Sequence, residues 1–168
     1  MNYYVKKLGH YWKPEGFSVA EAEKLDCTFW HEKSVIYFGQ KNPKMLEAGD
    51  VIVLEIESTK KIENHALAGI YRCLSRTVET SDGGPHTLEA VGYKWAFYVD
   101  VECLTPKFSN AAKVALESGK PALLHLSDIW KKDMAKGRLP YNAEWGYITK
   151  EDEEQIAKRI KDVEKTLK

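Results

Sequence analysis

Alternation of apolar and polar residues predicts three successive strands in the middle of the chain, over Asp50–Ser58, Ala66–Val78 and Lys94–Leu104. In the first strand the apolar residues face one way, and Glu55 and Glu57 are expected on an exposed opposite face. Turn-forming residues separate the three strands. Three long strands joined by turns predict an antiparallel meander that curls into a barrel or half-barrel.

Two shorter β segments are expected before the meander, at Tyr3–Leu8 and Val35–Phe38. Gly69, inside the second long strand, indicates a β-bulge or a close approach of another part of the chain. In the third long strand, alternate residues up to Cys103 share one face, and the acidic residues Asp100 and Glu102 lie on the other.

Helical patterns dominate the last third of the sequence. Ser109 is expected to cap a helix that ends near Gly119, and Pro121–Lys132 has a weaker helical pattern. Thr149 is expected to cap a final helix with acidic residues in its first turn and basic residues later, an order that suits the helix dipole. Its buried stripe consists of Ile156, Ile160, Val163 and Leu167. These elements predict one α+β domain over residues 1–168.

Composition limits the classes of function that remain. The 168 residues carry 25 basic and 25 acidic side chains, so a globally basic nucleic-acid binder is excluded and an anionic partner needs a local patch or pocket. No apolar run suits a membrane span, and no signal peptide is evident, so we expect a cytoplasmic protein without membrane contact. Cys27, Cys73 and Cys103 are expected to be small buried thiols in a reducing compartment.

Motifs of common enzyme classes are absent from the sequence. It has no nucleophile elbow, no phosphate-binding glycine loop, no dinucleotide fingerprint and no zinc-protease motif. Cys27 and His31 lie four residues apart in poor helical context, and the five histidines are scattered. We therefore expect no metal site, no cofactor and no catalytic residue, although an enzyme remains an open alternative.

Aromatic residues form the most informative cluster. Among the 5 Trp and 9 Tyr, several fall in the first 40 residues and alternate with polar side chains. An aromatic slot with polar edges suits a flat heteroaromatic ligand, because a ring stacks on its faces and polar groups read its edge. An ordinary aromatic core is the alternative for each residue. The candidate pocket residues are Trp12, Trp30, Ser34, Tyr37, Asn42 and Trp145.

Basic residues gather at a few positions despite the neutral total. Such clusters contact phosphates in nucleic-acid binders, although most charged runs are solvated surface. The candidate phosphate-binding residues are Lys41, Lys44, Lys131, Lys132, Lys136 and Arg138.

Several segments together resemble the EVE family of the PUA-like superfamily, which is related to the YTH domains. The resemblance lies in the order of weak motifs, including an aromatic first strand, a tryptophan segment and a Gly-Asp pair before a strand. The segments are Tyr3–Lys6, Phe29–His31, Lys41–Lys44, Leu46–Val53, Ala68–Ser75, Tyr93–Glu102 and Trp145–Ile156. The region from Lys107 to Tyr141 does not match clearly.

This resemblance implies a PUA-like, small curved antiparallel β-barrel with flanking helices. It also implies a non-enzymatic pocket that binds a modified nucleobase in DNA or RNA. Trp30 then matches the pocket tryptophan and Asn42 the polar residue before the Gly-Asp strand, while Tyr37, Trp12 and Trp145 compete as the second aromatic of the cage.

Two rival hypotheses remain. One is a small RNA- or nucleotide-processing enzyme that uses His31, and the other is a protein-interaction module of the same fold. The sequence leaves the oligomeric state and the identity of the modification open.

Overall fold

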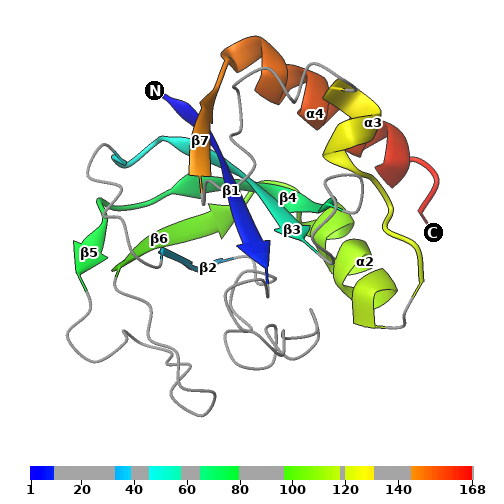
Figure 1. The fold of residues 1–168 in the computed structure, drawn as a ribbon, viewed down its shortest axis with the longest axis horizontal. Helices are drawn as coiled ribbons and strands as arrows, with labels where there is room; N and C mark the ends of the chain where they lie inside the picture. The colour runs from blue at the N-terminus through cyan, green and yellow to red at the C-terminus, as the bar shows by residue number, and fades with distance from the viewer. Residues whose placement is uncertain are drawn as a thin grey trace.

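The computed structural model describes residues 1–9, 33–38, 46–57, 65–79, 97–117, 120–130 and 145–167. These residues form an α+β fold with one sheet and three helices (Figure 1). The strands are β1 (Tyr3–Gly9), β2 (Lys33–Phe38), β3 (Val51–Glu57), β4 (His65–Cys73), β5 (Val78–Glu79), β6 (Phe97–Cys103) and β7 (Trp145–Ile148). The helices are α2 (Pro106–Glu117), α3 (Leu126–Trp130) and α4 (Lys150–Glu164).

The strands pair in the order β2-β6-β4-β3-β1-β7, with β5 attached to β6. The predicted meander of three long strands is present as the antiparallel series β3, β4 and β6. The sheet is nevertheless mixed, because β1 runs parallel to β3. The sequence did not predict this pairing, since strand direction depends on contacts between distant segments.

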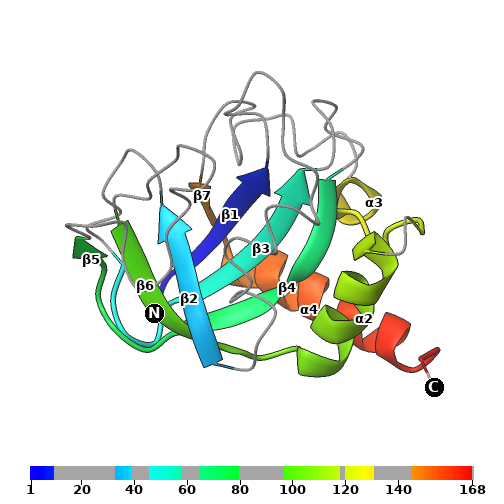
Figure 2. The same cartoon turned by 90° about the horizontal axis from the view of Figure 1, so that it is seen from below.

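The sheet is curled but not closed. The Lys6 ammonium on β1 lies 5.4 Å from the centroid of the Phe38 ring on β2, although these strands are far apart in the sheet order. Within the described ranges, no ladder joins β2 to β7. The structure is therefore a half-barrel rather than the closed barrel that the resemblance implied. Figure 2 shows the curl.

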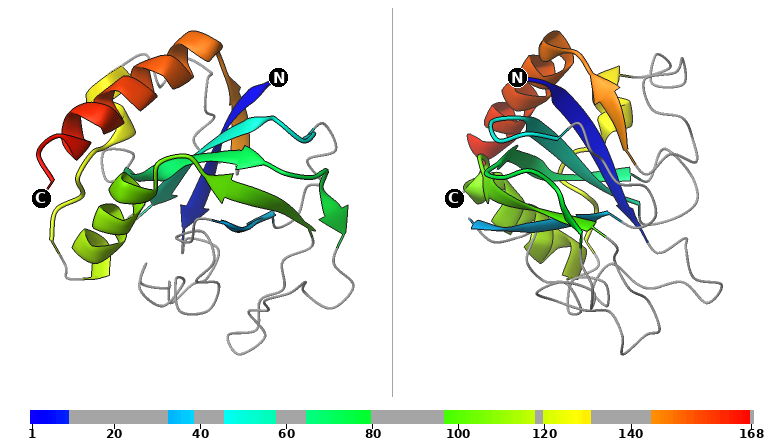
Figure 3. Two further views of the ribbon diagram at one scale, coloured as in Figure 1. Left: turned by 180° about the vertical axis from the view of Figure 1, so that it is seen from behind. Right: turned by 90° about the vertical axis from the view of Figure 1, so that its left-hand side faces the viewer.

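The three helices gather on one side of the sheet, as the views in Figures 1 and 3 agree. Helix α4 begins as predicted, because Thr149 accepts a hydrogen bond from the Asp152 amide and the Asp152 carboxylate accepts one from the Thr149 amide, each at 3.0 Å. Its side chains Ile156 and Ile160 are fully buried. No helix of the described chain is long and apolar enough to span a membrane.

Alternate positions on the strands form the core. On β6, Val99, Val101 and Cys103 are buried, whereas Asp100 is exposed and Glu102 is partly exposed, as predicted. The inner face continues onto the neighbouring strands through side chains such as Tyr4, Ile36, Phe38, Ile52, Leu54 and Tyr71.

Gly69 shows both features that the sequence suggested. The register shifts beside it, between Leu54 and Glu55, and its φ of 153° favours glycine. A Cβ at this position would lie 2.7 Å from the Thr105 Oγ1 atom and still closer to the Ser109 hydroxyl. The glycine therefore lets helix α2 approach β4.

Some predictions about these elements were wrong. Ser109 does not cap α2, because the helix begins at Pro106, whose lack of an N–H suits the first position. Ser109 is fully buried one turn inside the helix, and its amide donates to the Thr105 carbonyl at 2.8 Å. Helix α3 begins at Leu126, not at the predicted Pro121.

The second long strand ends earlier than predicted. Strand β4 stops at Cys73 because its partner β3 begins only at Val51, and the Cys73 carbonyl accepts a hydrogen bond from Gly49. Val78 belongs to the separate strand β5.

Glu55 is fully buried, not exposed as predicted. It lies at the register shift and pairs with Leu67, whose amide donates to the Leu124 carbonyl at 2.9 Å. The segment before α3 therefore covers this end of the sheet.

Candidate nucleic-acid interface

The structure describes only part of the predicted site. Trp145 opens β7 and is partly exposed. The backbone of β2 places Ser34 opposite Val101 and Tyr37 opposite Tyr98, in alternate rows of the strand. The remaining predicted pocket and phosphate residues lie outside the described ranges: Trp12, Trp30, Lys41, Asn42, Lys44, Lys131, Lys132, Lys136 and Arg138. Cys27 and His31 lie outside them as well.

The Gly-Asp pair fixes the start of β1. Gly49 has a φ of 96°, a backbone conformation that completes a turn. The buried Asp50 carboxylate accepts hydrogen bonds from the backbone amide of Glu47 at 3.0 Å and from that of Asn2 at 2.9 Å. The Val51 amide in turn donates to the Asn2 carbonyl at 3.0 Å. The motif that the sequence marked before β3 therefore also positions the side chains at the start of β1.

Three aromatic side chains meet where β1 pairs with β7, and we call them the aromatic corner: Tyr4, Trp145 and Tyr147. The centroid of the Tyr4 ring lies 5.0 Å from that of Tyr147 and 6.1 Å from that of Trp145, and the last two rings are 5.6 Å apart. Tyr4 is buried, whereas 56% of Tyr147 is exposed. The aromatic corner thus exposes the ring of Tyr147, which packs on the buried ring of Tyr4.

The Tyr4 hydroxyl is buried and has no hydrogen-bond partner of ordinary geometry, although it lies near the Asn2 side chain. Burial, and secondarily the Asp50 carboxylate, raises the pKa of Tyr4 to about 12. The phenol therefore keeps its proton at neutral pH.

Lys6 is the feature that the sequence reasoning missed. It lies opposite Trp145 in the ladder, is only 1% exposed, and holds its ammonium over the Phe38 ring on the inner face. A lysine seldom occupies such a position. The available signal was its spacing from Tyr4, because residues two apart on a strand share a face.

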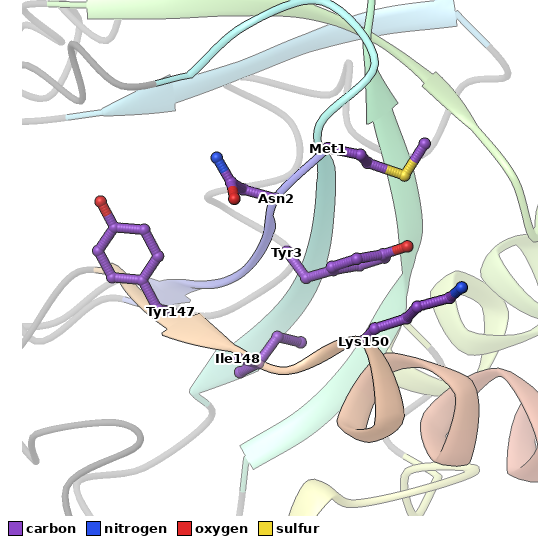
Figure 4. A pocket seen from close by; sticks show the side chains of 6 residues that line it. All are labelled: Met1, Asn2, Tyr3, Tyr147, Ile148 and Lys150. Carbon is purple, nitrogen blue, oxygen red and sulfur yellow. The ribbon is translucent and has the colours of Figure 1, made fainter.

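A shallow hollow of about 560 Å³ adjoins the aromatic corner, and we call it the edge hollow. Figure 4 shows Tyr3 between Met1 and Lys150, whereas the Tyr147 ring points away from these three side chains, as expected for a residue that pairs with Tyr4 rather than with Tyr3. The Lys150 side chain is mostly exposed and lies 3.9 Å from Glu154. The residues that line the edge hollow are Met1, Asn2, Tyr3, Tyr147, Ile148 and Lys150.

The described residues include two cysteines and several acidic side chains. They contain no group of three or more His, Cys, Asp or Glu that could hold a metal ion. Cys73 and Cys103 are free and buried, as predicted. Burial raises the pKa of the Cys73 thiol to about 12, so this thiol is a poor nucleophile at neutral pH.

No family model matches the sequence, and no curated protein is significantly similar to it. A search of solved structures found similar folds at low sequence identity. A hypothetical protein from Leishmania major is 11% identical, with a TM-score of 0.52 and 96% of each chain covered.

Two further structures have lower TM-scores. Human THYN1, solved in complex with 5-methylcytosine containing DNA, is 11% identical, with a TM-score of 0.47 over 95% of this chain and 98% of its own. A protein from Agrobacterium tumefaciens is 14% identical, with a TM-score of 0.48, and the match covers 95% of this chain and 93% of the Agrobacterium protein. At such identities likeness concerns the fold alone, and on that ground this chain has the fold of the Leishmania protein.

Proposed function

We propose that this protein is a non-enzymatic reader that binds a modified nucleobase in DNA or RNA, as the resemblance to the EVE family implies. The observation that carries the proposal is the pairing of Lys6 with Trp145. A buried ammonium and a partly exposed indole lie side by side on the inner face of a half-barrel.

This pair matches the chemistry of a base. The indole offers a face for stacking, which contributes about 1–3 kcal/mol for a nucleobase. Lys6 is only 1% exposed, so it acts by placing a positive charge beside the indole rather than by touching the base. A base taken from a stack needs such contacts to offset the cost of unstacking.

The proposed pocket includes residues beyond the described ranges. Trp30 stacks on the base, Ser34 and Asn42 bond to its edge, and the lysines Lys41 and Lys44 hold neighbouring phosphates. Trp12, Tyr37 and Trp145 compete as the second aromatic wall of the pocket. Trp145 is favoured because it lies opposite the buried Lys6 in the β1–β7 ladder.

The test is titration of labelled DNA and RNA oligonucleotides, with and without one methylated base, at two salt concentrations. The 5-methylcytosine DNA bound by human THYN1 is one of the probes. We expect at least a tenfold preference for a modified strand, which corresponds to about 1.4 kcal/mol. Binding without preference, or no binding at low salt, contradicts the proposal.

Variants sharpen this test. Trp30→Ala should abolish the preference while residual salt-dependent binding persists, because phosphate contacts do not depend on the base. Lys6→Met keeps the length of the buried side chain and should also weaken the preference. Lys161→Gln, on the exposed surface of α4, is the matched control and should leave the preference unchanged.

A further inference from the structure

We infer that Tyr4 determines the specificity of the proposed reader, because its buried hydroxyl hydrogen-bonds to an amino group on the edge of the base. The inference rests on the proposed function and adds to it a contact that the sequence did not suggest. It requires the exposed side chains of Asn2 and Tyr147 to turn aside when the base enters.

The first argument is the state of the hydroxyl. Tyr4 is 2% exposed, and among the described residues its hydroxyl has no hydrogen-bond partner of ordinary geometry. A buried polar group without a partner costs free energy, so phenylalanine would suit this position better if packing alone mattered. A ligand that bonds to the hydroxyl supplies the missing partner.

The second argument is position. Tyr4 and Lys6 lie on one face of β1, because residues two apart on a strand share a face. Their ladder partners on β7 are Tyr147 and Trp145. The centroid of the Tyr4 ring lies 6.1 Å from that of Trp145, a candidate wall of the proposed pocket. Tyr4 therefore borders the place where the base is proposed to stack.

The third argument is access to the Tyr4 hydroxyl, which lies close to the protein surface, near the side chains of Asn2 and Tyr147. Both of these side chains are exposed, and Figure 4 shows them on the same side of β1. Exposed side chains change rotamer readily, so these two can uncover the hydroxyl. The Lys6 ammonium differs, because it lies over the buried ring of Phe38.

The fourth argument is charge. Burial, and next the nearby carboxylate of the buried Asp50, raises the pKa of Tyr4 to about 12. The phenol therefore keeps its proton at neutral pH, and its oxygen can accept a hydrogen bond. A negative charge close by favours a ligand group with a positive end, which is the N–H of an amino group rather than a carbonyl oxygen.

The experiment titrates wild type and Tyr4→Phe with single DNA strands that differ at one central base. The base is 5-methylcytosine or N6-methyladenine, which both carry an amino N–H, or thymine, which keeps the methyl group of 5-methylcytosine but has a carbonyl in place of its amino group. Tyr4→Phe should bind the methylated strand that wild type prefers about tenfold more weakly. It should bind the thymine strand like wild type, because thymine has no amino group.

Tyr71→Phe is the matched control. It also removes a buried tyrosine hydroxyl, but this hydroxyl lies deep in the protein and hydrogen-bonds with Ser109 and Cys103. Tyr71→Phe should therefore bind every strand like wild type. Urea unfolding checks that each variant is folded under the conditions of the titration.

Tyr147→Ala tests the opening of the site. Loss of this ring leaves the Tyr4 hydroxyl more accessible, so the variant should bind the preferred strand at least as tightly as wild type. Tyr4→Phe should still weaken binding about tenfold in the Tyr147→Ala background, because the hydrogen bond to the base is still lost. Weaker binding of Tyr147→Ala would show that the ring contacts the base instead of turning aside, and it would overturn the proposed opening.

Each other outcome overturns a definite statement. Equal affinity of Tyr4→Phe and wild type for the preferred methylated strand overturns the inference and leaves the proposed function standing. An equal loss on the thymine strand also overturns the inference, because the hydroxyl then does not recognise an amino group. A wild type without preference for a modified base overturns the proposed function. The comparison of Tyr4→Phe with wild type on the 5-methylcytosine and thymine strands still decides whether the hydroxyl meets an amino group.

Discussion

The aromatic corner and the contact between β4 and α2 each bury one tyrosine of the same sheet. In the second region, which we call the α2 joint, the Tyr71 hydroxyl hydrogen-bonds with Ser109 and Cys103. The Ser109 hydroxyl also lies 3.2 Å from the Thr105 Oγ1 atom and 3.3 Å from the Cys103 sulfur. The α2 joint consists of Gly69, Tyr71, Cys103, Thr105 and Ser109.

In the aromatic corner the Tyr4 hydroxyl is equally hidden but has no partner of ordinary geometry. Its ring supports Tyr147, which is exposed, and Trp145, which is partly exposed. Polar groups that bond to one another hold a helix on a sheet, whereas rings left open to solvent can accept a ligand. The joint therefore holds α2 on the sheet, and under the proposed function the corner is the region that meets the ligand.

The largest expected effect tests the α2 joint. Gly69→Ala should lower the free energy of unfolding by about 3 kcal/mol, because a Cβ meets Thr105 and Ser109 and the positive φ is strained. Gly49→Ala is the matched control, since its φ is also positive but nothing lies within 4 Å of the added Cβ. It should cost about 1–2 kcal/mol. Urea unfolding measures both, and equal losses would show that α2 is not tightly held at Gly69.

The next effect tests the aromatic corner through pH. The pKa of Tyr4 is raised from 10.0 to about 12, so the unfolded chain loses this proton at lower pH than the folded protein does. Stability linked to Tyr4 is therefore complete below about pH 10 and falls as the pH rises toward 12. Tyr4→Phe should make the decline of unfolding free energy shallower over this interval, as measured by urea titrations at a series of pH values. An unchanged decline would mean that Tyr4 ionises as easily in the folded protein as in the unfolded chain.

The contrast between the two regions also explains what could be predicted from the sequence. Local patterns sufficed where a few neighbouring residues decide the outcome. The Thr149 cap, the alternation on β6 and the glycine of the bulge follow from short-range chemistry, and all are present. The Gly-Asp pair before β3 is of the same kind.

Predictions failed where contacts with a distant segment determine the position or burial of a residue. Ser109 looks like a cap, but its hydroxyl bonds to Cys103 and Thr105 because Gly69 allows α2 to come close. Glu55 looks exposed by alternation but is fully buried at the register shift, where its ladder partner Leu67 bonds to the distant Leu124. The parallel pairing of β1 with β3 and the burial of Lys6 against Phe38 likewise depend on how the sheet curls.

Most of the predicted pocket lies outside the described residues. Trp145 was named as a pocket candidate, whereas its neighbours Lys6, Tyr4 and Tyr147 were not, because these residues come together through the pairing of the first strand with a late one. Pairing across such a separation leaves no local pattern in the sequence.

The smallest expected effect compares the two buried tyrosines directly. Tyr71→Phe should lower the free energy of unfolding by about 1 kcal/mol, because it removes a hydroxyl that is bonded within the α2 joint. Tyr4→Phe removes a buried hydroxyl without a partner of ordinary geometry, so stability should change by less than about 0.5 kcal/mol or rise slightly. Both substitutions keep the ring, so packing is matched. Urea unfolding at neutral pH measures them, and an equal loss for both would mean that the Tyr4 hydroxyl is bonded in the folded protein and that the two regions do not differ in this respect.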